Sequence, residues 1–362
     1  MFGVSRAIWL GTAGVAALVV SCLACGGKSP TAPSPAPAPT PLPTTPPDPL
    51  RNAASAAGKL VGAAVQSSFL NDPRYAEVFD RHFNYVTAEY EMKWDPIERV
   101  RGSEDFLGGD SIASHAAGMG MKLKGHALVW HGAVPGWANG LSNADFRAAV
   151  ERHIRTVADH YRGQVYAWDV VNEAIADDGP GLRDSVFRQK LGDGYIADAF
   201  RLARQADPQA LLFYNDYGGE DLNAKSDRIY DLVRGLVQQG VPIDGVGLQM
   251  HISASNPPDA AAVASNMRRL VSLGLRVNIS EMDVQVRDLA PAVRLDVQKS
   301  VYHSIVAACV AESRCEAVTF WGFTDAHSWL NSPAGGDAPL LFDALYAPKP
   351  AFYGVQDAFS HR

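Results

Sequence analysis

The chain has 362 residues, a formal net charge of −7 at neutral pH and 47% hydrophobic residues. The acidic balance gives no support for a nucleic-acid partner, because such domains carry basic surfaces. After residue 50 the composition is that of an ordinary globular domain, long enough to bury a large core. That segment contains no CxxC or HExxH spacing, so the sequence predicts neither a metal site nor a cofactor.

Residues 1–25 predict an export signal of the lipoprotein type. The apolar run at residues 7–20 is short for a membrane span and lies where the hydrophobic region of a signal peptide belongs. Cys22 and Cys25 both fit a bacterial lipoprotein processing site, and simple cleavage without a lipid is the alternative. We therefore expect an exported protein, either a lipoprotein at the bacterial cell surface or in the periplasm, or a secreted one. A lipid anchor would be its contact with a membrane.

Residues 26–50 predict a disordered, Pro-rich linker. Ten of the twenty residues from 30 to 49 are proline, and such a segment stays extended as polyproline II without building a core. The remainder, residues 51–362, is expected to form a single catalytic domain.

Short β-like runs alternate with helical patterns through this domain. One helix is expected from Ser142, a plausible N-cap, because apolar residues recur at helical spacing through Phe146, Val150 and Ile154. Eight strands, each followed by a helix or a long excursion, predict an α/β fold of the (β/α)8 TIM-barrel type. An open doubly wound sheet is the alternative, but no GxGxxG opens a helix. The expected strands are 60–65, 85–89, 122–130, 165–173, 210–216, 245–251, 276–284 and 317–323.

Polar and aromatic residues gather at the carboxyl ends of these strands, where the chemistry of such a barrel takes place. Glu173 ends the fourth strand and Glu281 lies near the end of the seventh, so the two carboxylates can face each other across the mouth. Two carboxylates flanking a scissile bond are what glycoside hydrolysis needs: one delivers a proton, and the other attacks or activates water. Either residue alone would more often be a loop contact or an ion-pair partner.

The neighbouring residues suit the same chemistry. Asn172 can hydrogen-bond a sugar hydroxyl beside the reacting carbon. His251 could donate to Glu281 while Asp283 holds the imidazole from behind and keeps Glu281 ionised. Tryptophan faces suit the C–H faces of pyranose rings, although core packing is the usual role of this residue. The candidate tryptophans are Trp130, Trp321 and Trp329.

These residues belong to sequence motifs that follow one another along nearly the whole domain in the order typical of a known enzyme family. From about Ser55 to the C-terminus the chain resembles glycoside hydrolase family 10, the endo-β-1,4-xylanases. The matching pieces are EYEMKW (89–94), GHALVWH (125–131), WDVVNE (168–173), YNDY (214–217), GLQMHI (247–252), ISEMDV (279–284) and WGFTDAHSW (321–329).

The resemblance implies a role for each matched position in a retaining double displacement on xylan or xylooligosaccharides. Glu173 matches the acid/base and Glu281 the nucleophile. Glu89 and Lys93 match contacts to the next sugar on the non-reducing side, and Tyr217 resembles a residue of the leaving-group side. The positions that match the lining of the subsite where the bond is cut are His126, Trp130, Asn172, Gln249, His251, Trp321 and Trp329.

Two positions depart from the family pattern on the non-reducing, or glycone, side. Tyr90 stands where the family has Asn, and Ala133 stands where it commonly has Gln. We therefore expect Tyr90 to contact substrate in an altered glycone subsite. Two other functions remain open: a related retaining β-1,4-glycanase acting on glucan or aryl cellobiosides, and a glycan-binding surface protein without catalysis. A monomer is the default for this kind of enzyme.

The domain contains two cysteines, Cys309 and Cys315. Their separation of six residues across an expected helix end fits a local disulfide in an exported protein, and two free buried thiols are the alternative. The resemblance favours the disulfide, since both positions match one that is common in family 10.

Overall fold

The structure is a computed structural model that describes residues 48–331 and 337–361. The predicted signal, both lipidation candidates and most of the predicted linker therefore lie outside the described residues. The first helix, α1 (Leu50–Ala56), begins at a buried leucine inside the range predicted as linker. In the part of the chain that is described, no helix combines the length and the apolar character that a membrane crossing requires.

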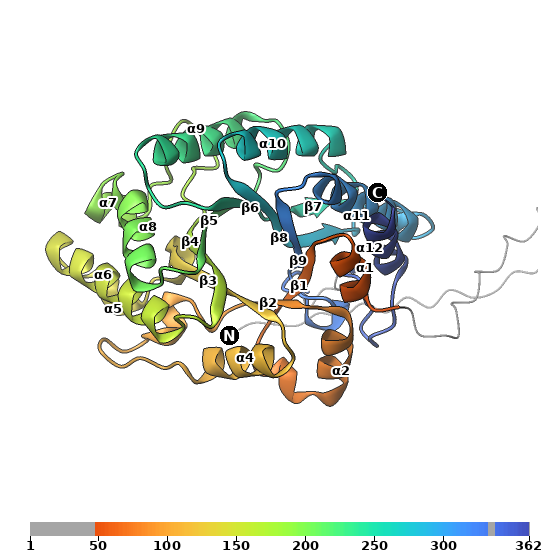
Figure 1. The fold of residues 1–362 in the computed structure, drawn as a ribbon, viewed down its shortest axis with the longest axis horizontal. Coiled ribbons are helices and arrows are strands. Elements are labelled where there is room, and N and C mark those ends of the chain that lie inside the picture. Colours follow the sequence, from red (N-terminus) through yellow and green to blue (C-terminus); the bar gives the residue numbers. More distant parts are fainter. Residues whose placement is uncertain (1–47, 332–336, 362) are drawn as a thin grey trace, which may run out of the picture. The chain divides into compact units, whose positions relative to one another are not determined.

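Eight parallel strands close into a barrel, as the sequence predicted (Figure 1). Neighbours in the ring pair in chain order, and the pairings of β1 with β9 and of β6 with β8 complete the circle. The short strand β7 (His251–Ser253) adds to the carboxyl-terminal part of β8. The barrel strands are β1 (Leu60–Val65), β2 (Tyr85–Ala88), β3 (Lys122–Trp130), β4 (Val165–Asn172), β5 (Leu211–Asp216), β6 (Gly245–Leu248), β8 (Arg276–Gln285) and β9 (Cys315–Phe320).

Helices surround the barrel on the outside (Figure 1). The longer ones are α2 (Pro73–His82), α4 (Leu107–Gly118), α6 (Asn143–His160), α8 (Tyr195–Ala206), α9 (Ala224–Gln238), α10 (Ala260–Ser272), α11 (Arg294–Ala311) and α12 (Pro350–Ser360). Short helical segments lie between strands and helices: α3 (Trp94–Ile97), α5 (Gly136–Asn139), α7 (Val186–Leu191), η1 (Phe69–Asn71), η2 (His131–Ala133) and η3 (Asp325–His327).

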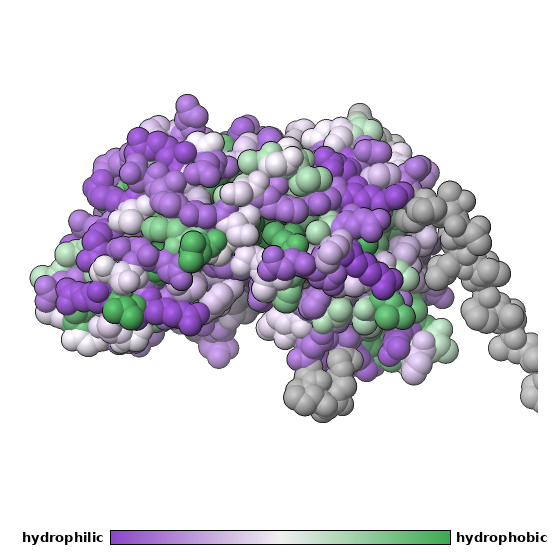
Figure 2. Space-filling view, turned by 90° about the horizontal axis from the view of Figure 1, so that it is seen from below, coloured by the Kyte–Doolittle hydropathy of each residue, from purple (hydrophilic) through white to green (hydrophobic). Residues whose placement is uncertain are grey.

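Helix α6 illustrates how local signals place these elements. The Ser142 side chain accepts a hydrogen bond from the Asp145 N–H and caps the first turn, as expected. Phe146, Val150 and Ile154 are buried, so the apolar stripe faces the barrel. Figure 2 shows the result on one side of the domain, where hydrophilic residues predominate and hydrophobic ones form small, separate patches.

Several predicted strand ends were wrong. Strand β9 ends at Phe320 and not at residue 323, and two further errors share one physical reason. The predicted strand 245–251 is interrupted after Leu248, and His251 begins a separate strand. Strand β4 ends at Asn172, one residue before the predicted end. Met250 and Glu173 have positive φ angles of 68° and 59°, a left-handed conformation that breaks the alternation of a strand. Both residues follow strands at the carboxyl-terminal end of the barrel, where the backbone turns out of the strand direction.

Cys309 and Cys315 form a disulfide with an S–S distance of 2.02 Å. It joins the end of α11 to the first residue of β9. The predicted pairing is thus present, at the end of a helix as expected.

Candidate active site

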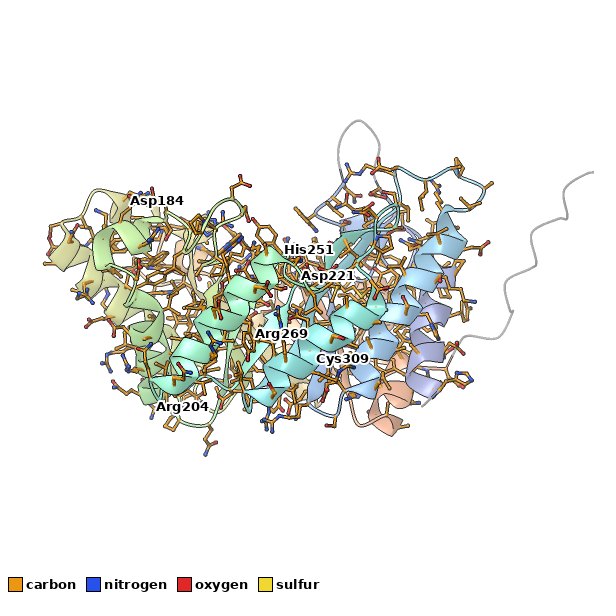
Figure 3. All side chains as sticks on the ribbon, turned by 90° about the horizontal axis from the view of Figure 1, so that it is seen from above. Asp184, Arg204, Asp221, His251, Arg269 and Cys309 are labelled. Atoms are coloured by element: carbon orange, nitrogen blue, oxygen red, sulfur yellow. A yellow bond between two sulfur atoms is a disulfide. The ribbon has the colours of Figure 1, made fainter. Side chains whose placement is uncertain are left out.

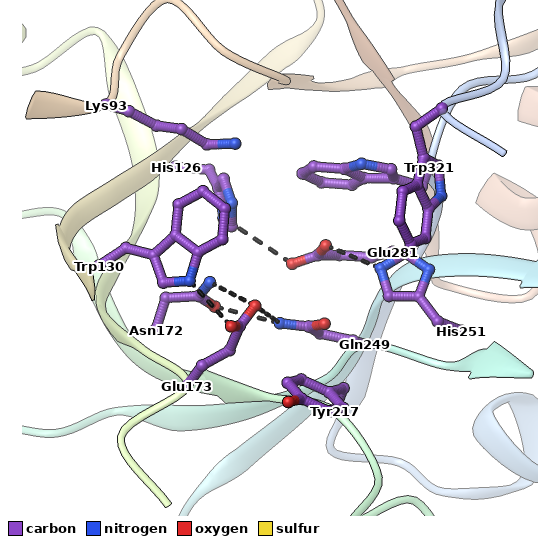
Figure 4. Close-up of a pocket in the computed structure, with 11 residues that line it drawn as sticks. Lys93, His126, Trp130, Asn172, Glu173, Tyr217, Gln249, His251, Glu281 and Trp321 are labelled. Atoms are coloured by element: carbon purple, nitrogen blue, oxygen red, sulfur yellow. Dashed lines mark hydrogen bonds and ion pairs between the residues drawn. The ribbon is translucent and has the colours of Figure 1, made fainter. Parts of the chain in front are cut away.

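A pocket of about 270 Å³ opens at the carboxyl ends of the strands (Figure 4). Figure 3 shows His251 near the upper rim of the domain and Arg204 toward the opposite end. The carboxyl-terminal parts of several strands and the loops that follow them supply the walls of the pocket, so residues far apart in sequence meet there. The lining residues are Lys93, His126, Trp130, Asn172, Glu173, Tyr217, Gln249, His251, Glu281, Trp321 and Trp329, all of them predicted site residues.

Glu281 projects from β8 and is 4% exposed. Its Oε2 lies 3.2 Å from Nε2 of His251, whose Nδ1 lies 2.8 Å from Oδ2 of Asp283. An imidazole that donates to a carboxylate through each nitrogen must be protonated. Burial by itself would lower the pKa of His251, but Asp283 and Glu281 raise it to about 10. His251 is therefore an imidazolium held between two carboxylates.

A second chain of charges reaches Glu281 from inside the barrel. His126 Nδ1 lies 2.9 Å from Asp169 Oδ2 and 3.9 Å from Glu281 Oε1. Lys124 Nζ lies 2.8 Å from the same Asp169 oxygen, and the side chains of both residues are fully buried. Burial would raise the pKa of Glu281, but His126, His251 and Lys124 lower it to about 2. Glu281 is thus held as an anion.

One group of possible metal ligands occurs among the described residues. The candidate ligand atoms of His126, Asp169 and Glu281 lie within 4.8 Å of one another. These side chains are already paired with each other, and Lys124 contributes an ammonium to the same cluster. The arrangement is accounted for by charge pairing within the protein.

Glu173 follows β4 and has different surroundings. Its Oε2 accepts a hydrogen bond from Trp130 Nε1 at 2.9 Å. Its Oε1 accepts from Asn172 Nδ2 at 3.0 Å and from Gln249 Nε2 at 3.1 Å. Each of these three donors is a neutral group, whereas the His251 side chain that donates to Glu281 is positively charged. The two carboxylates of the pocket therefore lie in distinct electrostatic environments.

Side-chain amides connect these two carboxylates. Asn215 Nδ2 donates to Glu281 Oε1 at 2.6 Å and to Asn172 Oδ1 at 2.8 Å. Asn172 in turn donates to Glu173, and Gln249 Nε2 donates to Asn172 Oδ1 at 3.3 Å. A buried network in which each amide has partners on both sides fixes the mutual orientation of its members.

Aromatic rings form the walls. The Lys93 ammonium lies 4.6 Å from the ring centroid of Trp130 and 5.7 Å from that of Trp321. Trp329 is 55% exposed, and its Nε1 donates to Asp283 at 2.8 Å. An indole anchored by its N–H and open on its face provides a flat apolar surface, such as a sugar ring can stack on.

Comparisons with known proteins agree with this geometry. The model of glycosyl hydrolase family 10 matches residues 49–358. The chain belongs to this family.

Curated and structural relatives of this family 10 member span nearly the whole domain. An endo-1,4-beta-xylanase of Agaricus bisporus is 39% identical over 313 residues, which cover 85% of this chain and 93% of the relative. The crystal structure of xylanase 10B from Thermotoga maritima is similar with a TM-score of 0.82 and 38% identity, covering 86% and 98% of the two chains. Xylanase 10B from Thermotoga petrophila, solved in complex with xylobiose, has a TM-score of 0.83 and 36% identity, with 88% and 98% covered.

Three predicted residues lie outside the pocket wall. Asp283 lies behind His251, as expected for a supporting residue. Glu89 accepts a hydrogen bond from Gln66 at 3.3 Å, and burial raises its pKa. Tyr90 is 39% exposed and accepts a hydrogen bond from Arg99 Nη2 at 3.2 Å. It lines a neighbouring hollow of about 380 Å³, together with Glu91, Pro96, Arg99, Asp105 and Gly108.

The sequence predictions did not include several functional contacts. Asn215 lies near the end of the predicted strand 210–216 but was given no role in the site, although it contacts Glu281. Lys124 and Asp169, which were also not assigned to the site, are charged residues within two of the predicted strands. Since β3 and β4 are neighbours and His126 pairs with Asp169 in their register, inward-facing charges on adjacent strands were the signal for this pair. Arg183 lies in an irregular segment and offered no such signal.

Proposed function

We propose that this family 10 member is a retaining endo-β-1,4-xylanase that cleaves internal bonds of xylan. The arrangement of Glu173 and Glu281 carries the proposal: both line one pocket, yet Glu281 is paired with the His251 imidazolium, whereas the side-chain donors to Glu173 are neutral. Glycoside hydrolysis with retention needs these two states, one carboxylate kept ionised and one able to carry a proton. The names of the relatives support xylan as the substrate.

In the proposed mechanism, Glu281 attacks the anomeric carbon while Glu173 protonates the leaving oxygen. The covalent xylosyl-enzyme is then hydrolysed by a water molecule that Glu173 deprotonates. Asn172 is held by Asn215 and Gln249 beside both carboxylates, so it can bind the hydroxyl next to the reacting carbon. Lys93 and Tyr217 lie on opposite sides of the pocket in Figure 4, and the family positions that they match supply the proposed direction of the sugar chain. Lys93 would face the glycone side and Tyr217 the leaving group.

The test is hydrolysis of linear xylohexaose followed by proton NMR. We expect the β-anomer among the earliest products, since two displacements at the anomeric carbon restore its configuration. An initial α-anomer excludes retention. Activity on carboxymethylcellulose that exceeds the activity on xylan favours a glucanase, and binding of xylooligosaccharides without cleavage favours a glycan-binding protein.

The glycone side of the cleft is proposed to be altered by Tyr90. Its ring is partly exposed and lines a hollow, its hydroxyl accepts a hydrogen bond from Arg99, and the residue lies between Glu89 and Lys93 in the chain. The small buried side chain of Ala133 leaves no hydrogen-bonding group where family members commonly have Gln.

Replacing Tyr90 with Asn is expected to change the product pattern on xylohexaose toward shorter products. A carboxamide would hydrogen-bond the second glycone sugar, whereas the phenol offers bulk and a ring face. The change in kcat/KM should be about tenfold or less, because one neutral hydrogen bond contributes roughly 1 kcal/mol. Chromatography of early products measures the pattern. An Arg99→Met variant tests whether the phenol needs its partner, and an unchanged pattern in Tyr90→Asn contradicts the proposal.

Replacing Asp283 with Asn is expected to move the acid limb of the pH profile upward. Asp283 helps to raise the pKa of His251 to about 10, and the His251 charge helps to lower the pKa of Glu281 to about 2. Activity is lost as the pH falls through the pKa of the nucleophile, so a higher Glu281 pKa brings the loss at a higher pH. We expect a shift of roughly one pH unit or more in kcat/KM.

The matched control is Trp329→Phe, which removes the other hydrogen bond to Asp283 but leaves its charge. This variant should weaken substrate binding and leave the acid limb where it is in the wild type. An unshifted limb in Asp283→Asn would show that the His251 charge does not depend on Asp283.

We also propose that the protein is exported as a monomer and carries a lipid at Cys22 or Cys25. The apolar run and the processing sites in residues 1–25 support export and the lipid anchor, and a monomer is the default for this kind of enzyme. Mass spectrometry of the N-terminal peptide from wild type and from Cys22→Ala and Cys25→Ala tests the anchor. A mature chain without a lipid in all three would leave secretion as the alternative.

A further inference from the structure

The segment after β4 turns back and returns to Glu173. An antiparallel bridge pairs Ile175 with Leu182, and the Arg183 N–H donates to the Ala174 carbonyl at 2.7 Å. The side chain of Arg183 thereby reaches the carboxyl end of β4, although ten residues separate it from Glu173.

The backbone of Glu173 needs such support. Its φ of 59° lies in the left-handed region, which a residue with a Cβ occupies only when the surroundings hold it there. The Glu173 N–H donates to the Asn215 carbonyl at 2.8 Å. The Glu173 carbonyl accepts a hydrogen bond from Nε of Arg183 at 3.0 Å. One peptide unit of the proposed proton donor is thus held by a strand, and the next by a guanidinium.

The same guanidinium contacts the leaving-group side of the pocket. Its Nη2 donates to the Tyr217 hydroxyl at 3.0 Å, and its Nη1 lies 2.9 Å from Asp177. Lys225 closes the cluster, with its ammonium 2.9 Å from Asp177 and 3.6 Å from the ring centroid of Tyr217. Glu173 and Tyr217 both face the pocket in Figure 4. A planar fork with five N–H groups can serve these separate acceptors at once, which a lysine ammonium cannot.

We infer that Arg183 is a positioning residue that fixes the Glu173 carboxyl relative to the sugar on the leaving-group side, an inference that rests on the proposed function. Its rigid guanidinium binds both the backbone carbonyl of Glu173 and the hydroxyl of Tyr217. A general acid acts only within hydrogen-bond reach of the oxygen that it protonates. Loosening this link therefore slows those cleavages in which the leaving group needs a proton.

The test compares kcat/KM for two aryl β-xylobiosides, one with phenol and one with 2,4-dinitrophenol as the leaving group. Phenolate is a poor leaving group and needs protonation, whereas dinitrophenolate leaves without it. Arg183→Met is expected to lose about 10- to 100-fold on the phenyl substrate and less than about threefold on the dinitrophenyl substrate. Arg183→Lys should show the same selective loss, because charge alone does not bridge the two partners.

An equal loss on both substrates, no loss, or full activity of Arg183→Lys would overturn the inference. Should Arg183→Met fail to fold, Asp177→Asn replaces it, since this change removes the carboxylate that orients the guanidinium; a smaller loss with the same selectivity is expected. Arg201→Met is the control: Arg201 is exposed on α8 and pairs with Asp198 at 3.4 Å, and its loss should leave both values unchanged. Wild-type protein that cleaves neither substrate nor xylan would overturn the proposed function itself.

Discussion

Replacing Glu281 with Gln is expected to lower kcat on xylan by about 10⁴-fold or more, as loss of a nucleophile does in other enzymes with covalent intermediates. The carboxamide has nearly the shape of the carboxylate, but its single oxygen can accept a hydrogen bond from only one of Asn215 and His251, which contact different oxygens of Glu281. It cannot form the glycosyl-enzyme. Steady-state kinetics on xylan and on an aryl β-xylobioside measure the loss, and calorimetric titration with xylohexaose should show that binding persists.

The matched control for this variant is Glu316→Gln. Glu316 lies in β9 outside the pocket, and its carboxylate pairs with Arg276 at 2.6 Å. Losing this partly exposed ion pair should change stability slightly and leave turnover unaffected. Turnover of Glu281→Gln within about tenfold of the wild type would remove Glu281 from the proposed chemistry.

Replacing Glu173 with Gln is expected to produce a loss that depends on the leaving group. On xylan, where the leaving sugar must be protonated, we expect kcat/KM to fall roughly 10²- to 10⁴-fold. On a dinitrophenyl xylobioside, kcat/KM should fall far less, because the first displacement needs no acid. Deglycosylation then limits turnover, since the general base is absent as well.

Azide provides a second measurement on the Glu173→Gln variant. A small anion that needs no base can attack the xylobiosyl-enzyme beside position 173, restore turnover of the activated substrate and give the β-xylobiosyl azide. Glu281→Gln serves as the comparison, because its loss should be similar for both leaving groups. A uniform loss in Glu173→Gln, without rescue by azide, would contradict its assignment as the acid/base.

Much of the barrel could be predicted because its signals are local. The short β-like runs, the Ser142 cap and the apolar stripe of α6 each depend on residues that are close together in the sequence. Most of the candidate site could be predicted as well, since parallel strands of a barrel present their carboxyl ends at one edge. Two of the wrong strand ends lie where a single residue adopts a left-handed conformation, at Met250 and Glu173, because propensity patterns carry no information on such angles.

The amino-acid sequence was sufficient to predict the barrel, the motifs of family 10 and the two carboxylates at the ends of the fourth and seventh predicted strands. The electrostatic difference between these carboxylates, in contrast, depends on the folded arrangement. Lys124 and Asp169 are buried together and act on Glu281 through His126, which requires the register of neighbouring strands. Charges that are distant in sequence interact strongly only when folding removes the water between them, so the sequence marked Lys124 and Asp169 only as charges inside adjacent strands and could not reveal their effect on Glu281.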